Sequence, residues 1–167
     1  VATEMSIFEK VYTAAFENEW NILIARLAKL GDAIPIEAEL GFHLCYGSMN
    51  NKHWKEPDDL TICMLVLNKL TNQLVREIDF VHVPVPINRK DGDYYMPLET
   101  WELKSRQDIF LGLIHEEDGL EGNLARIKTA SRYLSRFGLS TECGMGRRDP
   151  GVIPKWMNLM SELAMKI

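Results

Sequence analysis

A histidine and a cysteine two positions apart, His43 and Cys45, form the pattern with the clearest chemical meaning in this sequence. They end an apolar stretch that stops at Gly47, as a buried strand does. Side chains alternate between the two faces of a strand, so His43 and Cys45 are expected on the same face. Imidazole nitrogen and thiolate sulfur are ligands that zinc prefers. The pair alone is also typical of a buried histidine beside a buried free cysteine, so the remaining histidines and cysteines carry the argument.

Four apolar segments alternate with amphipathic stretches along the chain, and this order predicts parallel strands joined by right-handed helical crossovers. The central strands are continuous apolar runs, which is typical of strands covered on both faces. The spacing predicts strands over 38–45, 78–83, 108–114 and 139–142, helices over 4–30, 57–73, 97–104, 120–136 and 152–166, and long loops over 47–56 and 87–96.

Two architectures fit this order: an open doubly wound sheet and half of an eightfold β/α barrel. An open sheet usually carries a phosphate-binding glycine fingerprint after its first strand, and the residues from Gly47 to Asn50 do not form one. The units repeat about every 30 residues, as in barrels. We therefore expect one α/β domain over 1–167, with a leading helix within 1–32. Over 38–167 it has four parallel β/α units, the C-terminal half of a TIM-type (β/α)8 barrel.

Five of the seven histidines and cysteines fall at the ends of the predicted strands. The carboxyl ends of parallel strands form one face, and that face carries the site in β/α proteins. A zinc site with three or four protein ligands and one position open to substrate is therefore expected. His82 is either a ligand or a core histidine, and His115 is a catalytic proton-transfer group, an orienting partner or a ligand. The five residues are His43, Cys45, His82, His115 and Cys143.

Other polar and aromatic residues near these strand ends are candidates for substrate binding. Arg147 and Arg148 can bind a carboxylate, although surface arginines are the more common case. Cys63 lies on a predicted helix stripe and is expected in the core. His53 lies in a polar loop and is expected to be solvated or to contact substrate. The aromatic candidates are Tyr46, Trp54 and Tyr94, and Tyr94 and Tyr95 either cover the site or stack on its rim.

Composition limits the function classes. The chain has 167 residues, 46% of them apolar, and a net charge of −5, which suits one domain with a sizeable core. Its basic residues form no stripe with interleaved aromatics, so we expect no nucleic acid partner. It has no apolar run of about 20 residues and no signal pattern, so we expect no membrane contact and a cytoplasmic location. Three cysteines at unrelated spacings fit a reducing compartment.

Two segments together resemble the carboxyl-terminal catalytic domain of cobalamin-independent methionine synthase. They are Phe42-His43-Leu44-Cys45-Tyr46 and the run from Thr141 through Cys143-Gly144 to Arg148. That domain is an eightfold β/α barrel in a superfamily shared with uroporphyrinogen decarboxylase, and the resemblance covers about 38–165, its second half. In the family a His-x-Cys, a glutamate on the next strand and a late Cys-Gly bind catalytic zinc. The resemblance implies His43, Cys45 and Cys143 as zinc ligands.

The sequence departs from the family at the glutamate, where His82 stands on the corresponding strand and is expected to take its place at the metal. The resemblance is therefore to an uncharacterised branch. It implies a zinc-dependent methyltransferase-like enzyme that uses a small-molecule thiol and a methyl donor. A metal-independent decarboxylase or lyase and a non-catalytic half-barrel subunit remain alternatives. Because four units cannot close a barrel, we also expect a homo-oligomer or a partner that supplies the other half.

Overall fold

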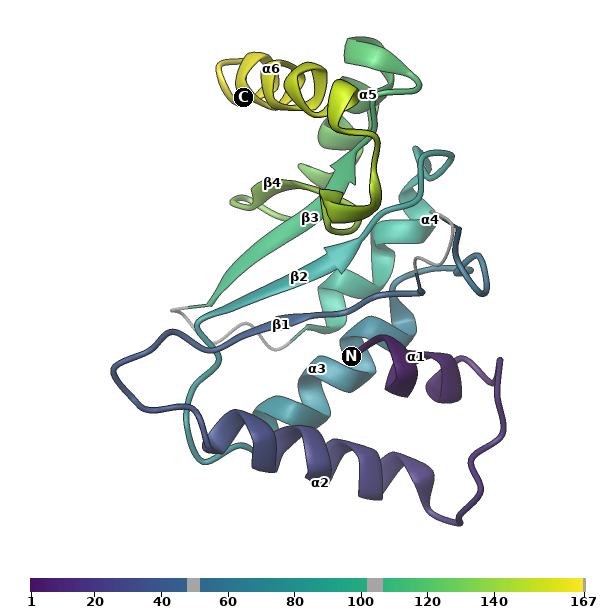
Figure 1. The fold of residues 1–167 in the computed structure, drawn as a ribbon, viewed down its shortest axis with the longest axis vertical. Helices are drawn as coiled ribbons and strands as arrows, with labels where there is room; N and C mark the ends of the chain where they lie inside the picture. Colours follow the sequence, from purple (N-terminus) through teal and green to yellow (C-terminus); the bar gives the residue numbers. More distant parts are fainter. Residues whose placement is uncertain (48–51, 102–106, 167) are drawn as a thin grey trace.

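The computed structural model describes residues 1–47, 52–101 and 107–166, except for the side chain of Arg147 (Figure 1). The four strands are β1 (Gly41–His43), β2 (Phe80–Pro84), β3 (Asp108–Ile114) and β4 (Gly138–Thr141). The α-helices are α1 (Ala2–Phe8), α2 (Glu19–Asp32), α3 (Thr61–Gln73), α4 (Gly92–Tyr95), α5 (Gly119–Ala130) and α6 (Ile153–Ala164). Short 3-10 helices cover Met96–Thr100, Met145–Arg147 and Pro150–Val152. Within the described residues, no helix combines the length and apolar character needed to cross a bilayer.

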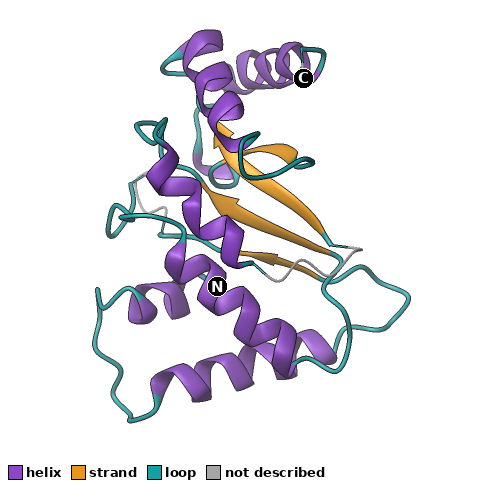
Figure 2. Ribbon diagram, turned by 180° about the vertical axis from the view of Figure 1, so that it is seen from behind, coloured by secondary structure: helices purple, strands orange, loops and turns teal. Residues whose placement is uncertain are grey.

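The strands form one sheet in the order β1-β2-β3-β4, and every neighbouring pair is parallel. The predicted α/β half barrel, with helical residues before its first strand, is therefore confirmed. Figure 2 shows helices in front of the sheet on one side, whereas in Figure 1 the strands are seen from the other side with few elements across them. We call these the outer and inner faces of the sheet.

The strand register assigns different residues to the two faces. Paired residues of a parallel sheet share a face, and the aliphatic side chains that pack against the helices are buried, as the pair Val81 and Ile109 illustrates. On the opposite face, His43 pairs with His82, which pairs with Phe110. The inner face thus carries polar and aromatic side chains, whereas the outer face carries the hydrophobic core. Such a division suits a sheet whose inner face holds a site.

The leading helix predicted over 4–30 is wrong, because the chain forms two helices with a non-helical stretch between them. Lys10 and Asn18 both have φ of 57°, a left-handed conformation that interrupts a helix. The Phe8 ring stacks on Trp20 with centroids 4.1 Å apart, which brings the two helices together. Tyr12, which lies within the segment predicted to be helical, is 59% exposed. The apolar spacing over 4–30 is therefore compatible with one long helix, but the chain forms two short helices.

The loop predicted over 87–96 is also partly wrong, because α4 forms within it. The Asp91 side chain accepts a hydrogen bond from the Tyr94 backbone N–H and caps α4. The helix predicted over 97–104 begins one residue earlier, as a 3-10 turn, and its last residues lie outside the described ranges. The third strand matches its predicted bounds.

Candidate metal centre

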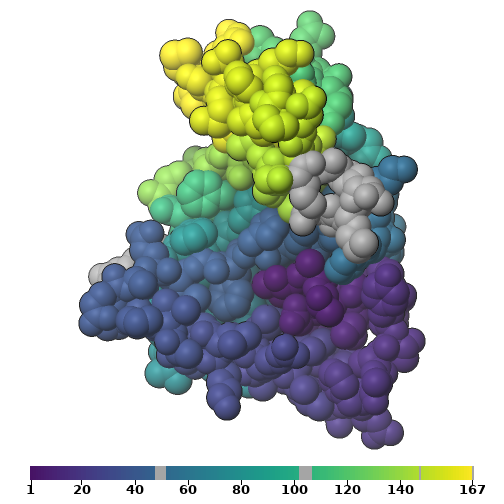
Figure 3. Space-filling view, in the orientation of Figure 1, coloured from purple at the N-terminus to yellow at the C-terminus, as the bar shows by residue number. Residues whose placement is uncertain are grey.

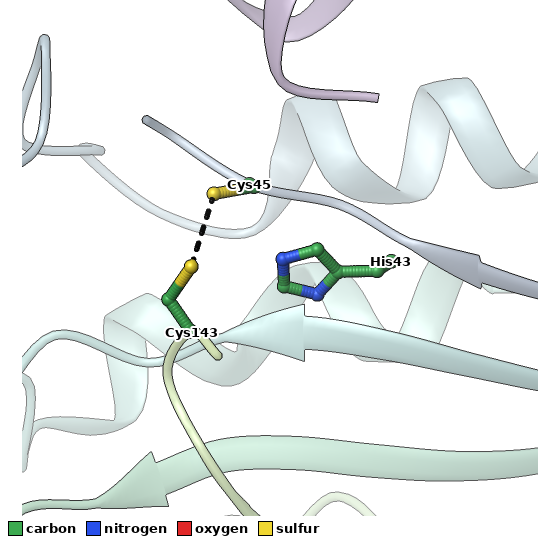
Figure 4. Close-up of side chains that lie close together, drawn as sticks. All are labelled: His43, Cys45 and Cys143. Atoms are coloured by element: carbon green, nitrogen blue, oxygen red, sulfur yellow. Dashed lines mark hydrogen bonds between the residues drawn. The ribbon is translucent and has the colours of Figure 1, made fainter. Parts of the chain in front are cut away.

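Three side chains from distant parts of the sequence meet at one edge of the sheet. His43 ends β1, Cys45 lies two residues further on, and Cys143 lies two residues after β4. One ligand atom from each residue lies within 4.8 Å of the other two. The two Sγ atoms are 3.9 Å apart. Figure 4 shows the sulfurs and the His43 ring turned toward one another. This group could hold a metal ion.

A glycine in β3 lets the chain reach this position after β4. Strands β1 and β4 are the two outer strands of the sheet, so a flat sheet would hold them roughly 14 Å apart. A Cβ atom at Gly112 would lie 2.7 Å from the Glu142 Cα and 3.0 Å from the Thr141 carbonyl oxygen. The backbone after β4 therefore crosses β3 closely at Gly112, and this crossing carries Cys143 toward Cys45.

The donor set fits zinc. Two cysteine sulfurs and one imidazole nitrogen would make three protein ligands and leave a fourth tetrahedral position open. Burial, and after it the neighbouring Cys143, raise the pKa of the Cys45 thiol to about 11. Without a cation the Cys45 thiol therefore stays protonated at neutral pH. A dication bound between the two sulfurs would stabilise both thiolates.

His82 does not belong to this group. It lies in the middle of β2, not at its end. Its Nδ1 lies 2.6 Å from the Nδ1 of His43, and its Nε2 lies 3.0 Å from the Thr141 carbonyl oxygen. Burial, and after it the His43 imidazole, lower the pKa of His82 to about 4. His82 is therefore neutral and contacts the expected ligand His43 with one nitrogen and β4 with the other.

His115, the expected catalytic residue, follows β3 and is buried. Its Nε2 lies 2.8 Å from the Val85 carbonyl oxygen. A carbonyl oxygen only accepts hydrogen bonds, so Nε2 carries a proton. Burial lowers the pKa of His115, so the ring is neutral and its Nδ1 is unprotonated. In this state Nδ1 can accept a proton.

A buried arginine on α5 holds the backbone around His115. Arg126 is fully buried, and all five of its N–H groups have acceptors. It forms a bidentate pair with Asp118, at 2.7 and 2.8 Å, and donates to Asn123 Oδ1. The same Asn123 oxygen accepts from the His115 backbone N–H at 2.9 Å. The remaining acceptors are the carbonyl oxygens of Leu113 and Ile87. This network joins the ends of β2 and β3.

A pocket of about 390 Å³ lies at the same edge of the sheet. His53 contacts Glu142 at 3.1 Å through Nε2 and Glu56 at 3.0 Å through Nδ1. Burial alone would lower the pKa of His53, but the two carboxylates outweigh it and raise the pKa to about 9. His53 is therefore a cation at neutral pH. The lining residues are Lys52, His53, Glu56, Pro86, Ile87, His115, Glu117, Glu142 and Arg148.

The expected substrate-binding residues fall in different places. Arg148 lines the pocket, where its guanidinium lies 4.8 Å from the Trp156 ring centroid and 3.5 Å from Glu117. The side chain of Arg147 lies outside the described part of the structure. Trp54 is half-buried, and its ring covers the backbone of Gly47, whose φ is 90°.

The two tyrosines do not present their hydroxyls to the pocket. Tyr46 is buried with its hydroxyl 3.1 Å from the Cys63 sulfur, and Tyr94 is fully buried and donates to the Pro84 carbonyl oxygen. Both belong to the core because their hydroxyls find internal partners. Cys63 is fully buried, as expected.

Sequence reasoning missed most of the charged residues of the pocket, including Glu142 and Glu117. Their positions in the sequence could have identified them, because Glu142 directly precedes Cys143 and Glu117 is two residues after His115. It also missed Arg126, because arginines on helices are usually exposed.

Together the fold and this site define an α/β half barrel with a His/Cys/Cys group at the carboxyl ends of its strands. No family model and no curated protein matches the sequence. Among solved structures, the chain is similar to a Listeria monocytogenes protein described as "Putative Vitamin-B12 Independent Methionine Synthase", with 20% identity and a TM-score of 0.56. The match covers 95% of this chain and 44% of that one, so this chain spans less than half of its length. This likeness shows a shared fold.

Proposed function

We propose that the protein is a zinc-dependent, methyltransferase-like enzyme that activates a small-molecule thiol, with zinc held by His43, Cys45 and Cys143. The convergence of one imidazole and two thiols at a single point is the observation that carries this proposal. The fold shared with the protein described as "Putative Vitamin-B12 Independent Methionine Synthase" supports it. Three free cysteines and no disulfide in the described residues suit a reducing, cytoplasmic setting.

When bound, zinc supplies a positive charge that lowers the pKa of a thiol in its open position and stabilises the thiolate nucleophile. The chain's own residues then have separate roles. The unprotonated Nδ1 of His115 accepts the proton that the substrate thiol loses. Arg148 binds a substrate carboxylate in the adjacent pocket. The sulfur–carbon bond forms as the bond between the methyl carbon and its donor breaks, and the donor atom leaves with the electron pair.

Binding of thiols to the cobalt-substituted protein tests this proposal. We expect both 3-mercaptopropionate and 2-mercaptoethanol to change the visible absorption spectrum of bound Co²⁺, because the thiol enters the open position. Arg148→Ala is expected to weaken 3-mercaptopropionate about tenfold, since it removes a hydrogen bond between charged groups. It is expected to leave 2-mercaptoethanol unchanged, because this thiol has no carboxylate.

The absence of any spectral change with millimolar amounts of either thiol would contradict thiol activation. An equal loss for both thiols in the Arg148→Ala variant would remove the assigned role of the arginine. Turnover that survives complete chelation would instead favour the metal-independent decarboxylase or lyase.

We also propose that the inner face of the sheet pairs with a second copy of the chain. Phe80 is 36% exposed on this face, and its ring packs edge-on against Phe110 with centroids 6.0 Å apart. Figure 3 shows teal and green atoms of the sheet at the surface on this side. A half barrel leaves its inner face and both outer strands without the partners that a closed barrel supplies.

Analytical ultracentrifugation tests this pairing. We expect a dimer whose dissociation constant rises at least about tenfold in the Phe80→Glu variant, because a charge would replace an aromatic contact at the interface. The matched change at an exposed outer position, Leu65→Glu, is expected to leave the dimer intact. A wild-type chain that sediments as a monomer at high micromolar concentration would refute the pairing.

A further inference from the structure

We propose that His82 is a positioning residue: it holds His43 with a proton on Nδ1, so that the unprotonated Nε2 faces the two cysteine sulfurs. The first part of this inference concerns the metal-free chain alone. The second part, its effect on metal affinity, rests on the proposed zinc site.

The first step is the contact between His82 and β4. The His82 Nε2 lies 3.0 Å from the Thr141 carbonyl oxygen. Because a carbonyl oxygen only accepts, Nε2 must carry the proton of this hydrogen bond. Thr141 is two strands away, and the path crosses Gly112 of β3. A Cβ atom at Gly112 would lie 3.0 Å from the His82 Nε2, so the glycine leaves room for the ring to reach β4.

The second step is the contact between the two histidines. The two Nδ1 atoms are 2.6 Å apart, so one must donate and the other must accept. His82 is 9% exposed, and its two hydrogen-bond contacts in the described structure are an imidazole and a carbonyl oxygen. One proton on each ring satisfies both contacts, and the proton of His82 is already on Nε2. The His82 Nδ1 therefore accepts, and the His43 Nδ1 donates.

The third step is the free nitrogen of His43. A neutral imidazole with its proton on Nδ1 has a lone pair on Nε2. Figure 4 shows this nitrogen on the side of the ring that faces the sulfurs of Cys45 and Cys143. The chain of contacts from Thr141 through His82 thus presents a lone pair where a metal would bind. Hydrogen-bonded partners of this kind orient metal-ligating histidines and increase their basicity.

Nitrogen NMR of the metal-free protein tests the first part. With ¹⁵N-labelled histidine, two-bond ¹H–¹⁵N correlations distinguish protonated from unprotonated ring nitrogens. We expect His43 protonated on Nδ1 and His82 on Nε2. A His43 ring protonated on Nε2 would overturn the inference, whatever the protein binds.

Zinc titration of variants against a competing chelator tests the second part. His82→Phe is expected to lower zinc affinity 10- to 100-fold and to move the His43 proton toward Nε2, because the acceptor is lost. His82→Gln is expected to restore most of the affinity, since an amide can both accept from His43 and donate to Thr141. Val81→Ala is the control, because Val81 is buried on the outer face of the same strand. It is expected to lower stability without changing the His43 tautomer.

The two parts fail in different ways. Unchanged zinc affinity in His82→Phe would overturn the positioning role and leave the zinc proposal intact. A wild-type chain that has the expected tautomer but does not bind zinc would refute the proposed function and leave the hydrogen-bonded pair of histidines intact.

Discussion

Cys45→Ser and Cys143→Ser are each expected to weaken zinc binding by on the order of a hundredfold or more. Each change removes one of the three proposed protein ligands, and a serine hydroxyl does not ionise near neutral pH as a metal-bound thiol does. The two sulfurs lie 3.9 Å apart, so both belong to the same site and both losses should be similar in size. Zinc titration against a chromophoric chelator measures the affinity, and elemental analysis of the purified variants measures the content.

Cys63→Ala is the matched control for this prediction. Cys63 is fully buried on α3 and its sulfur contacts the Tyr46 hydroxyl, so it is a thiol outside the candidate site. This variant is expected to keep its zinc. Full metal content in both serine variants, or equal loss in Cys63→Ala, would contradict the assignment of the ligands.

Asp118→Ala is expected to lower the free energy of unfolding by about 3–5 kcal/mol, because it leaves the buried charge of Arg126 without its carboxylate. The pair is bidentate, and Lys90 approaches the same carboxylate at 2.8 Å. Urea unfolding followed by circular dichroism measures the change. The control is Asp108→Ala, which removes an exposed ion pair with Arg136 and is expected to cost less than about 1 kcal/mol. Equal losses in the two variants would contradict the structural role of Arg126.

The Asp118 carboxylate also makes the free energy of unfolding depend on pH, and the sign of this dependence follows from its pKa. Burial alone would raise the pKa of Asp118, but the hydrogen bonds from Arg126 and Lys90 outweigh it and lower the pKa to about 2. A carboxylate whose pKa is lower in the folded state stabilises the fold at pH values above its unfolded pKa of about 3.9. This contribution is lost as the pH falls through about 2. The difference between wild type and Asp118→Ala should therefore be full at pH 5 and smaller at pH 2.

The sheet was predictable from the sequence because its strands are apolar runs with clear ends, and the segment 108–114 is the plainest case. The order of strands and helices then places His43, Cys45 and Cys143 at one edge, since parallel strands end on the same side. No side-chain contact is needed for that argument.

The role of His82 was not predictable in this way. Sequence places it in a strand, but its neighbours depend on the register between β1 and β2 and on the crossing of the chain at Gly112. A shift of one residue would turn His82 to the opposite face. The same reason applies to Arg126, because two of its acceptors, the carbonyl oxygens of Leu113 and Ile87, lie on other segments and cannot be read from local spacing.

The helix predicted over 4–30 was wrong for a different reason. Apolar spacing over 4–30 fits a single helix, but the break depends on left-handed residues at Lys10 and Asn18 and on the contact between Phe8 and Trp20. Tertiary contacts of this kind override local pattern. The burial of Tyr94 was missed for a similar reason, because its hydroxyl donates to the Pro84 carbonyl oxygen at the end of β2, a contact that local pattern does not predict.

The most direct test of the central claim is an anomalous difference map from crystals of the zinc-loaded protein, recorded at the zinc absorption edge. We predict one strong peak, about 2.3 Å from the sulfurs of Cys45 and Cys143 and about 2.0 Å from the Nε2 of His43. A zinc peak elsewhere in the molecule, with this group free of metal, would contradict the account.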